Sequence, residues 1–113
     1  MAINKKDEFS KNENGISIFA KALSHPARIA ILKTLAAKNS CICGEIVEVM
    51  PLSQSTVSQH LKELKNAGLI IGEIEGPTSC YFINYKKLLD EFSSLQKLIE
   101  YLKEKGKSYN CCS

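Results

Sequence analysis

Cysteine is the residue type in this chain whose spacing most clearly predicts chemistry. The 113 residues include five cysteines, of which Cys41 and Cys43 are separated by one residue and Cys111 and Cys112 are adjacent. An odd count excludes complete pairing within one chain, so thiols or metal ligands are expected rather than a full set of disulfides. Thiolates select soft ions such as trivalent arsenic and antimony, Cd, Pb, Zn and Cu(I). Oxidation of a dithiol to a disulfide is the alternative chemistry.

The backbone around Cys41 and Cys43 decides whether both sulfur atoms can reach one ion. Residues two positions apart in a regular helix point about 200° apart, whereas an extended or helix-starting segment lets both thiolates bind the same ion. Ser40 and Gly44 flank the pair, so we predict a helix start and a metal site here, with buried structural thiols as the alternative. Cys80 falls in a predicted strand and is interpreted as a packing residue.

A run of polar side chains between residues 53 and 68 is the second candidate site. Val57, Leu61 and Leu64 recur at helical spacing and predict a buried face, with Ser53 as the N-cap and Gly68 as the C-terminal stop. The opposite face offers hydroxyls, amides and ammonium groups, which match the base edges and phosphates of DNA. A solvated amphipathic face is the alternative. The predicted DNA-binding residues are Gln54, Ser55, Thr56, Ser58, Gln59, His60, Lys62 and Lys65.

These two sites need a scaffold, and the hydrophobic spacing and turn residues of the chain predict one. The expected order is helix, helix, short helix, turn, helix, hairpin and long helix. A helix-turn-helix followed by a β-hairpin is a winged helix, so the predicted fold is mainly α with a β-hairpin wing (α+β). The expected ranges are 15–23, 26–38, a short helix that opens at 41–44, 53–68, strands over 69–75 and 80–85, and 86–105.

Composition bounds the class of protein. The chain is 44% apolar and 24% charged, as soluble globular domains are, and its net charge of +3 is compatible with nucleic-acid binding. It shows no membrane-length apolar run and no secretory signal, so we expect a cytoplasmic protein. The sequence contains no nucleophile motif, Gly-rich phosphate loop or acid–base pair that would indicate an enzyme. A soft-metal scavenger is another class of protein to distinguish from a DNA-binding regulator. One domain is predicted over 15–105, between a flexible arm over 1–14 and a cysteine-containing tail over 106–113.

The last predicted helix carries an apolar stripe with the spacing 4, 3, 4, 3. Its members are Leu88, Phe92, Leu95, Ile99 and Leu102. Such heptad spacing predicts a seam between packed helices. Packing on the core of the same chain is the alternative, whereas pairing with a second copy would add burial that so short a chain can use.

Three motifs together resemble the ArsR/SmtB family of metal-responsive repressors. They are SHPARIAIL at 24–32, STVSQHLKEL at 55–64 and AGLI at 67–70, and the resemblance covers about residues 16–105. It implies a homodimeric winged helix that leaves its operator DNA when an inducer binds. It also implies that Cys41 and Cys43 occupy the family's metal box, and that Phe19 and Leu23 of the first helix join the seam of the last helix at the dimer interface.

This sequence departs from the family pattern at several positions. Some arsenic-sensing relatives place a third cysteine where this chain has Ile46, which leaves Cys111 and Cys112 of either chain as candidates for the third thiolate. Lys86 and Lys87 stand where other relatives begin a metal site on the last helix with Asp and His, so Zn, Ni or Co binding there is disfavoured. The expected inducer is therefore As(III) or Sb(III), with Cd, Pb and Zn as lesser candidates, and DNA binding itself requires no cofactor.

Overall fold

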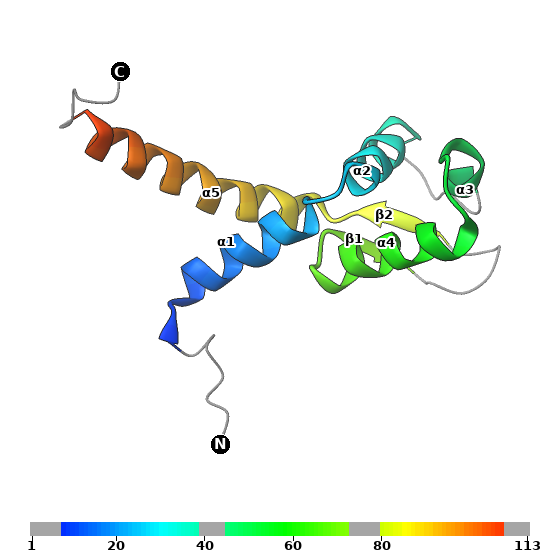
Figure 1. Ribbon diagram of the computed structural model, residues 1–113, viewed down its shortest axis with the longest axis horizontal. Coiled ribbons are helices and arrows are strands. Elements are labelled where there is room, and N and C mark those ends of the chain that lie inside the picture. The colour runs from blue at the N-terminus through cyan, green and yellow to red at the C-terminus, as the bar shows by residue number, and fades with distance from the viewer. Residues whose placement is uncertain (1–7, 39–44, 73–79, 108–113) are drawn as a thin grey trace.

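The computed structural model describes residues 8–38, 45–72 and 80–107, and its helices and strands follow the predicted order (Figure 1). The elements are α1 (Lys11–Ala22), α2 (Pro26–Lys38), α3 (Glu45–Val49), α4 (Gln54–Asn66), β1 (Ile70–Gly72), β2 (Tyr81–Ile83) and α5 (Tyr85–Gly106). Helices α2, α3 and α4 and the two strands form one body, and α1 and α5 extend away from it side by side. Among the described residues, no helix is long and apolar enough to cross a membrane.

Helix α1 begins at Lys11, before the predicted start at Gly15, because a capping box defines its N-terminus. The Glu13 amide donates to Ser10 Oγ at 3.0 Å, and the Ser10 amide donates to Glu13 Oε1 at 3.2 Å. These bonds satisfy two backbone donors that an uncapped first turn leaves without partners. The first turn is polar, so the apolar periodicity that predicted this helix does not reach its true start.

Helix α4 has both of its predicted boundaries. The Ser53 hydroxyl accepts the Thr56 amide at 3.3 Å as N-cap. At the other end the Gly68 amide donates to the Lys65 carbonyl at 2.9 Å, and the Leu69 amide donates to the Leu64 carbonyl at 3.0 Å. This is a Schellman ending, which needs a left-handed residue, and Gly68 supplies it with a φ of 81°. The chain then turns directly into β1.

The two strands form an antiparallel hairpin in which Ile70, Ile71 and Gly72 pair with Ile83, Phe82 and Tyr81 respectively. Gly72 has a φ of 148°, and a Cβ at this position would collide with the carbonyl oxygen of Cys80. The close approach of the two strands therefore requires glycine here. The described strands are shorter than the predicted ranges, and residues 73–79 lie outside the described part of the chain.

The core lies between α2, α4 and the inner face of the hairpin. Its largest fully buried side chains are Ile31, Ile46, Val57, Leu64 and Leu69. Phe19 and Ala22, at the end of α1, extend this cluster. Helix α4 is thus held by its apolar face, and its opposite face remains available for binding.

Candidate DNA-binding interface

The solvent-facing side of α4 carries most of the predicted DNA-binding residues. The structure leaves six of these side chains exposed and Ser58 and His60 half-buried. The exposed six are Gln54, Ser55, Thr56, Gln59, Lys62 and Lys65. Val57 and Leu64 on the other side are completely buried, so the helix cannot rotate without opening the core. The predicted amphipathic division of this helix is confirmed.

Hydroxyl groups cluster at the start of α4. Ser53 Oγ lies 3.2 Å from Ser55 Oγ and 3.0 Å from Thr56 Oγ1. The first turn contains no acidic residue, so no carboxylate there neutralises the partial positive charge of the helix N-terminus. Backbone amides and hydroxyls at such an end suit phosphate oxygens or acceptors on base edges. The hydroxyls of Ser55 and Thr56 also support the cap, which gives each of them a local role as well.

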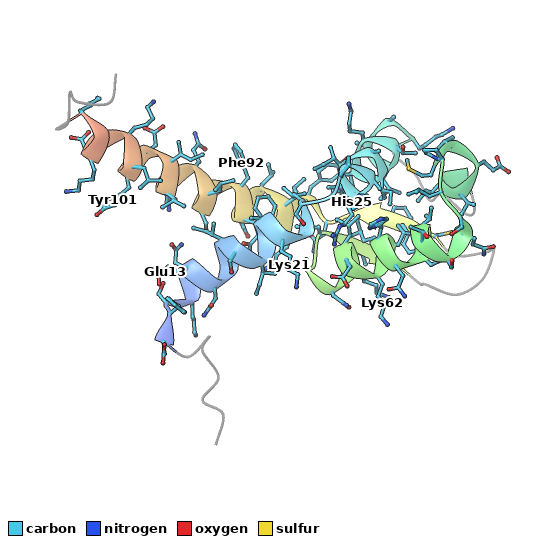
Figure 2. All side chains as sticks on the ribbon, viewed as in Figure 1. Glu13, Lys21, His25, Lys62, Phe92 and Tyr101 are labelled. Atoms are coloured by element: carbon cyan, nitrogen blue, oxygen red, sulfur yellow. The ribbon has the colours of Figure 1, made fainter. Side chains whose placement is uncertain are left out.

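A histidine pair joins α4 to the turn before α2. The ring centroids of His25 and His60 are 4.4 Å apart, with an angle of 44° between the ring planes. His25 Nδ1 accepts the Ala27 amide at 3.0 Å, which caps the first turn of α2. Figure 2 shows His25 between α2 and α4, whereas Lys62 projects from the opposite side of α4. His60 therefore lies at the margin of the polar face, where it contacts the scaffold.

An ion pair reinforces the same junction one turn further along both helices. Arg28 Nη1 lies 3.8 Å from Glu63 Oε2, and the Arg28 side chain is only 12% exposed. Both Nε and Nη1 of Arg28 are buried and have no hydrogen-bond partner. Neither contact of this junction is predicted by the sequence patterns. The motif SHPAR contains His25 and Arg28, but only the three-dimensional packing brings them to α4.

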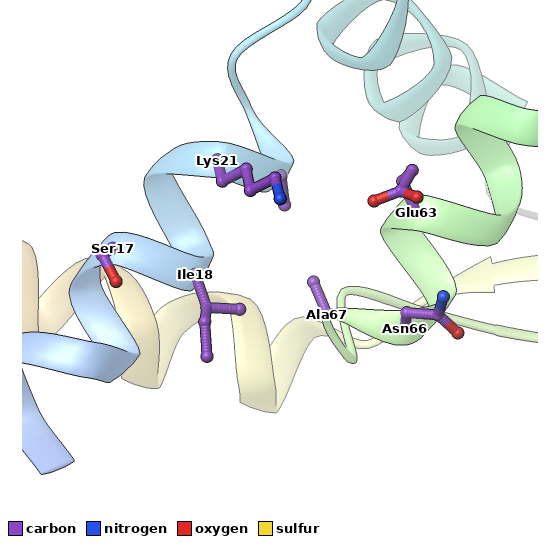
Figure 3. A pocket seen from close by; sticks show the side chains of 7 residues that line it. Ser17, Ile18, Lys21, Glu63, Asn66 and Ala67 are labelled. Atoms are coloured by element: carbon purple, nitrogen blue, oxygen red, sulfur yellow. The ribbon is translucent and has the colours of Figure 1, made fainter. Parts of the chain in front are cut away.

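A mixed cavity of about 430 Å³ separates α1 from the C-terminal half of α4. Figure 3 shows Lys21 on the α1 side and Glu63 on the α4 side, with Ile18 and Ala67 forming part of its apolar wall. Glu63 is therefore flanked by two helices that each carry a basic side chain, Lys21 on α1 and Arg28 on α2.

The comparisons with known proteins agree with this geometry. The profile of the family "Bacterial regulatory protein, arsR family" matches residues 25–71, which run from the turn before α2 to β1. An uncharacterized HTH-type transcriptional regulator of Methanocaldococcus jannaschii is 37% identical over 93 residues, which are 81% of this chain and 98% of that protein. The arsenical resistance operon repressor of Bacillus subtilis is 32% identical over 93 residues, 81% of this chain and 85% of that protein. The chain belongs to the arsR family.

The solved structures support the same fold. An ArsR-like transcriptional regulator from Rhodococcus sp. RHA1 superimposes with a TM-score of 0.71 at 18% identity, over 88% of this chain and 92% of that one. The predicted winged helix-turn-helix is confirmed. As an arsR-family member the protein is a transcriptional regulator, not an enzyme.

The cysteines of this arsR-family regulator are divided between described and undescribed segments. Cys41, Cys43, Cys111 and Cys112, the four predicted metal ligands, lie outside the described residues. Cys80, directly before β2, is half-buried and disulfide-bonded. Its interpretation as a simple packing residue was therefore wrong. Within 8–38, 45–72 and 80–107, no group of three or more His, Cys, Asp or Glu side chains is arranged to hold a metal ion.

The predicted dimer residues of the arsR-family regulator fall into two groups. Phe19 is 3% exposed in the core of its own chain, and three more residues are partly buried against that core. Those three are Leu23, Leu88 and Leu95. Phe92, Ile99 and Leu102 remain 51%, 46% and 56% exposed. The near end of the predicted seam thus packs on its own chain, and the far end extends into solvent.

Proposed function

We propose that this arsR-family regulator is a repressor that binds operator DNA as a homodimer and releases it when a soft metal(loid) ion, foremost As(III) or Sb(III), binds to cysteine thiolates. The observation that carries the proposal is the division of α4. Its apolar side is fixed in the core, and its other side presents amides, hydroxyls and lysines to solvent.

The polar face of α4 is suited to the major groove. The N-terminal part of a recognition helix reads base edges, and here that part carries Gln54, Ser55 and Gln59. Lys62 and Lys65 follow and would neutralise phosphates, which fix orientation without reading sequence. The rigid attachment of α4 to α2 and to the hairpin would hold these groups in one geometry.

A second copy of the chain is the proposed cover for α5. No residue of this helix is buried, and all of it is described. Phe92, Ile99 and Leu102 lie along the exposed part of the heptad stripe. A two-fold axis through this stripe would bury it symmetrically and present two α4 helices to successive turns of DNA. Phe19 and Leu23 would support the interface from beneath.

The proposed inducer site precedes α3, which packs against α4. Cys41 and Cys43 would supply two thiolates, and Cys111 or Cys112 the third that As(III) prefers. Binding would draw the start of α3 toward the ion, and α3 would pass that displacement to α4. A coupling of the usual size would weaken operator binding about 5- to 150-fold.

The experiment that tests this function is fluorescence anisotropy of the reduced protein on the DNA upstream of its own gene. Arsenite, antimonite, cadmium and zinc are titrated into the preformed complex. We expect nanomolar-range binding that weakens with salt, and release by arsenite or antimonite at the lowest concentrations. Binding without release by any of the four ions would remove the sensor part of the proposal and leave DNA binding in place.

A second candidate function is control by oxidation, and the disulfide at Cys80 favours it. Two thiols would lose two protons and two electrons to form one disulfide, and a peroxide would take them up and become two waters. A cross-link at Cys80 would restrain the wing at the residue directly before its second strand. If this function holds, hydrogen peroxide changes operator affinity, dithiothreitol reverses the change, and Cys80→Ser abolishes it. Equal responses of wild type and Cys80→Ser would exclude it.

A further inference from the structure

We propose that the cavity between α1 and α4 binds a small zwitterion of the free amino-acid class, and that this ligand sets the angle between the DNA-reading helix and the helices of the proposed dimer. The binding site itself is independent of the proposed inducer site, whereas its effect on operator DNA rests on the function proposed above. The cavity has a volume of about 430 Å³, which is within the range of small-molecule sites.

Opposite charges face this cavity from its two walls. Lys21 lies on the α1 wall and Glu63 on the α4 wall, and both residues are exposed (Figure 3). Within the described residues, Glu63 pairs with Arg28 at 3.8 Å through Oε2, and Lys21 forms no ion pair. The Oε1 atom of Glu63 and the Lys21 ammonium are therefore both available to a ligand that lies between them.

The rest of the lining supplies an apolar wall and neutral hydrogen-bonding groups. Ile18 and Ala67 are apolar, and Ile18 is 47% exposed, so an aliphatic group placed over it would bury apolar surface from both sides. The exposed Asn66 side chain can donate to a carboxylate or accept from an ammonium. The Ser17 hydroxyl donates to the Asn14 carbonyl at 2.8 Å, which leaves its oxygen as an acceptor.

A zwitterion matches this set of groups better than an ion with a single charge. The carboxylate of an amino acid would pair with Lys21, its ammonium with Glu63, and an aliphatic side chain would lie against Ile18. A simple anion would be attracted by Lys21 but repelled by the Glu63 carboxylate, and a simple cation would meet the reverse situation. The two walls therefore select for a ligand that carries both charges.

The position of the cavity connects such a ligand to operator affinity. Helix α1 packs along α5, whereas α4 packs against α2, α3 and β1 (Figure 1). A ligand held by Lys21 and Glu63 would join these two groups of elements and fix the angle between them. In a dimer formed through α5, this angle sets the separation of the two α4 helices, which has to match successive turns of DNA. A coupling of the usual size changes operator affinity about 5- to 150-fold.

The first test uses the full-length reduced protein without DNA. Its thermal unfolding is followed with each standard amino acid at millimolar concentration, and isothermal titration calorimetry gives the Kd of the most stabilising one. At least one is expected to raise Tm by several degrees. Lys21→Gln and Glu63→Gln should each weaken its binding about tenfold or more, because each removes one charged hydrogen-bond partner. The matched control is Lys33→Gln, an exposed lysine of α2 outside the cavity lining, which should bind like wild type.

Two analogues of that amino acid, the amine without the carboxylate and the acid without the ammonium, test the need for both charges. Each is expected to bind about tenfold more weakly or worse. No stabilisation by any amino acid, equal binding of either analogue, or a folded Lys21→Gln protein that binds like wild type would overturn the proposal. Binding that appears only in a monomeric variant would also overturn it, because a second copy would then cover the cavity.

Operator anisotropy with and without the bound amino acid tests the coupling separately. A changed affinity in wild type that Lys21→Gln loses supports it, and an unchanged affinity in the presence of saturating ligand overturns the regulatory part of the proposal. Absence of operator binding under all conditions would overturn the DNA-reading function instead, and the calorimetric result would still decide whether the cavity is a binding site.

Discussion

Replacing Ile99 with glutamate is expected to convert the proposed dimer into a monomer and to lower operator affinity about a hundredfold or more. Ile99 lies on the exposed part of the α5 stripe and is 46% exposed in the single chain. In a two-fold dimer its substitute would place two carboxylates in an apolar seam without partners, which costs far more than the lost contact. Two linked recognition helices gain about 10²- to 10⁴-fold over one, and a monomer forfeits that gain.

The matched control is Ser93→Glu, which makes the same change in charge on the opposite side of α5. Ser93 is exposed and lies outside the heptad stripe. Analytical ultracentrifugation gives the oligomeric state and anisotropy gives the operator affinity of both variants. Ser93→Glu should remain dimeric and bind normally. A dimeric Ile99→Glu protein, or a monomeric wild type that binds the operator tightly, would contradict the proposed interface.

A single chain leaves much of the apolar surface around this seam exposed. Helix α1 lies beside the first part of α5 (Figure 1), and Phe9 and Ile18 are exposed as well. Leu89 and Tyr101 of α5 are also exposed, at 62% and 59%, but they lie outside the stripe. Contiguous apolar patches on soluble proteins often mark interaction sites. We therefore propose that a partner covers the stripe, and heptad spacing favours another helix as that partner.

Local sequence patterns were sufficient to predict the elements whose boundaries are defined by a few residues. Ser53 and Gly68 marked the two ends of α4, and apolar residues at helical spacing marked its buried face. The start of α1 escaped because its capping residues, Ser10 and Glu13, precede the first apolar residue. Polar features were predicted where their residues are close together in the sequence, and they were missed where the residues are far apart.

The junction between α2 and α4 shows why the remainder of the site could not be predicted. His25 lies in the turn before α2 and His60 lies in α4, and nothing in either segment specifies the other. Their contact depends on how α2 and α4 cross over the shared core of Ile31, Val57 and Leu64. The Arg28–Glu63 pair depends on the same crossing. Such contacts can be identified only when the packing of the helices is known, whereas the amphipathic face of α4 can be identified from residue spacing in the sequence.

The double variant Cys41→Ser, Cys43→Ser is expected to bind operator DNA like wild type but to lose its response to arsenite. Serine keeps the size and the local hydrogen bonding of cysteine, but its hydroxyl does not provide the thiolate that soft ions select. The arsenite effect should fall from about 5- to 150-fold to less than about twofold, because the coupling between the two sites requires an occupied inducer site. Anisotropy on the operator, with arsenite added to the reduced protein, measures both properties in one titration.

Two further variants distinguish the sources of the third thiolate. Cys111→Ser, Cys112→Ser should weaken the arsenite response if the tail completes the site, because a two-thiolate site binds As(III) less tightly. Cys80→Ser tests the remaining cysteine, which precedes β2, is disulfide-bonded in the structure and is outside the predicted ligand set. A Cys41→Ser, Cys43→Ser protein that still leaves the operator at wild-type arsenite concentrations would show that the inducer binds elsewhere. If Cys80→Ser alone abolished release, the ligand set would have to be rebuilt around the wing.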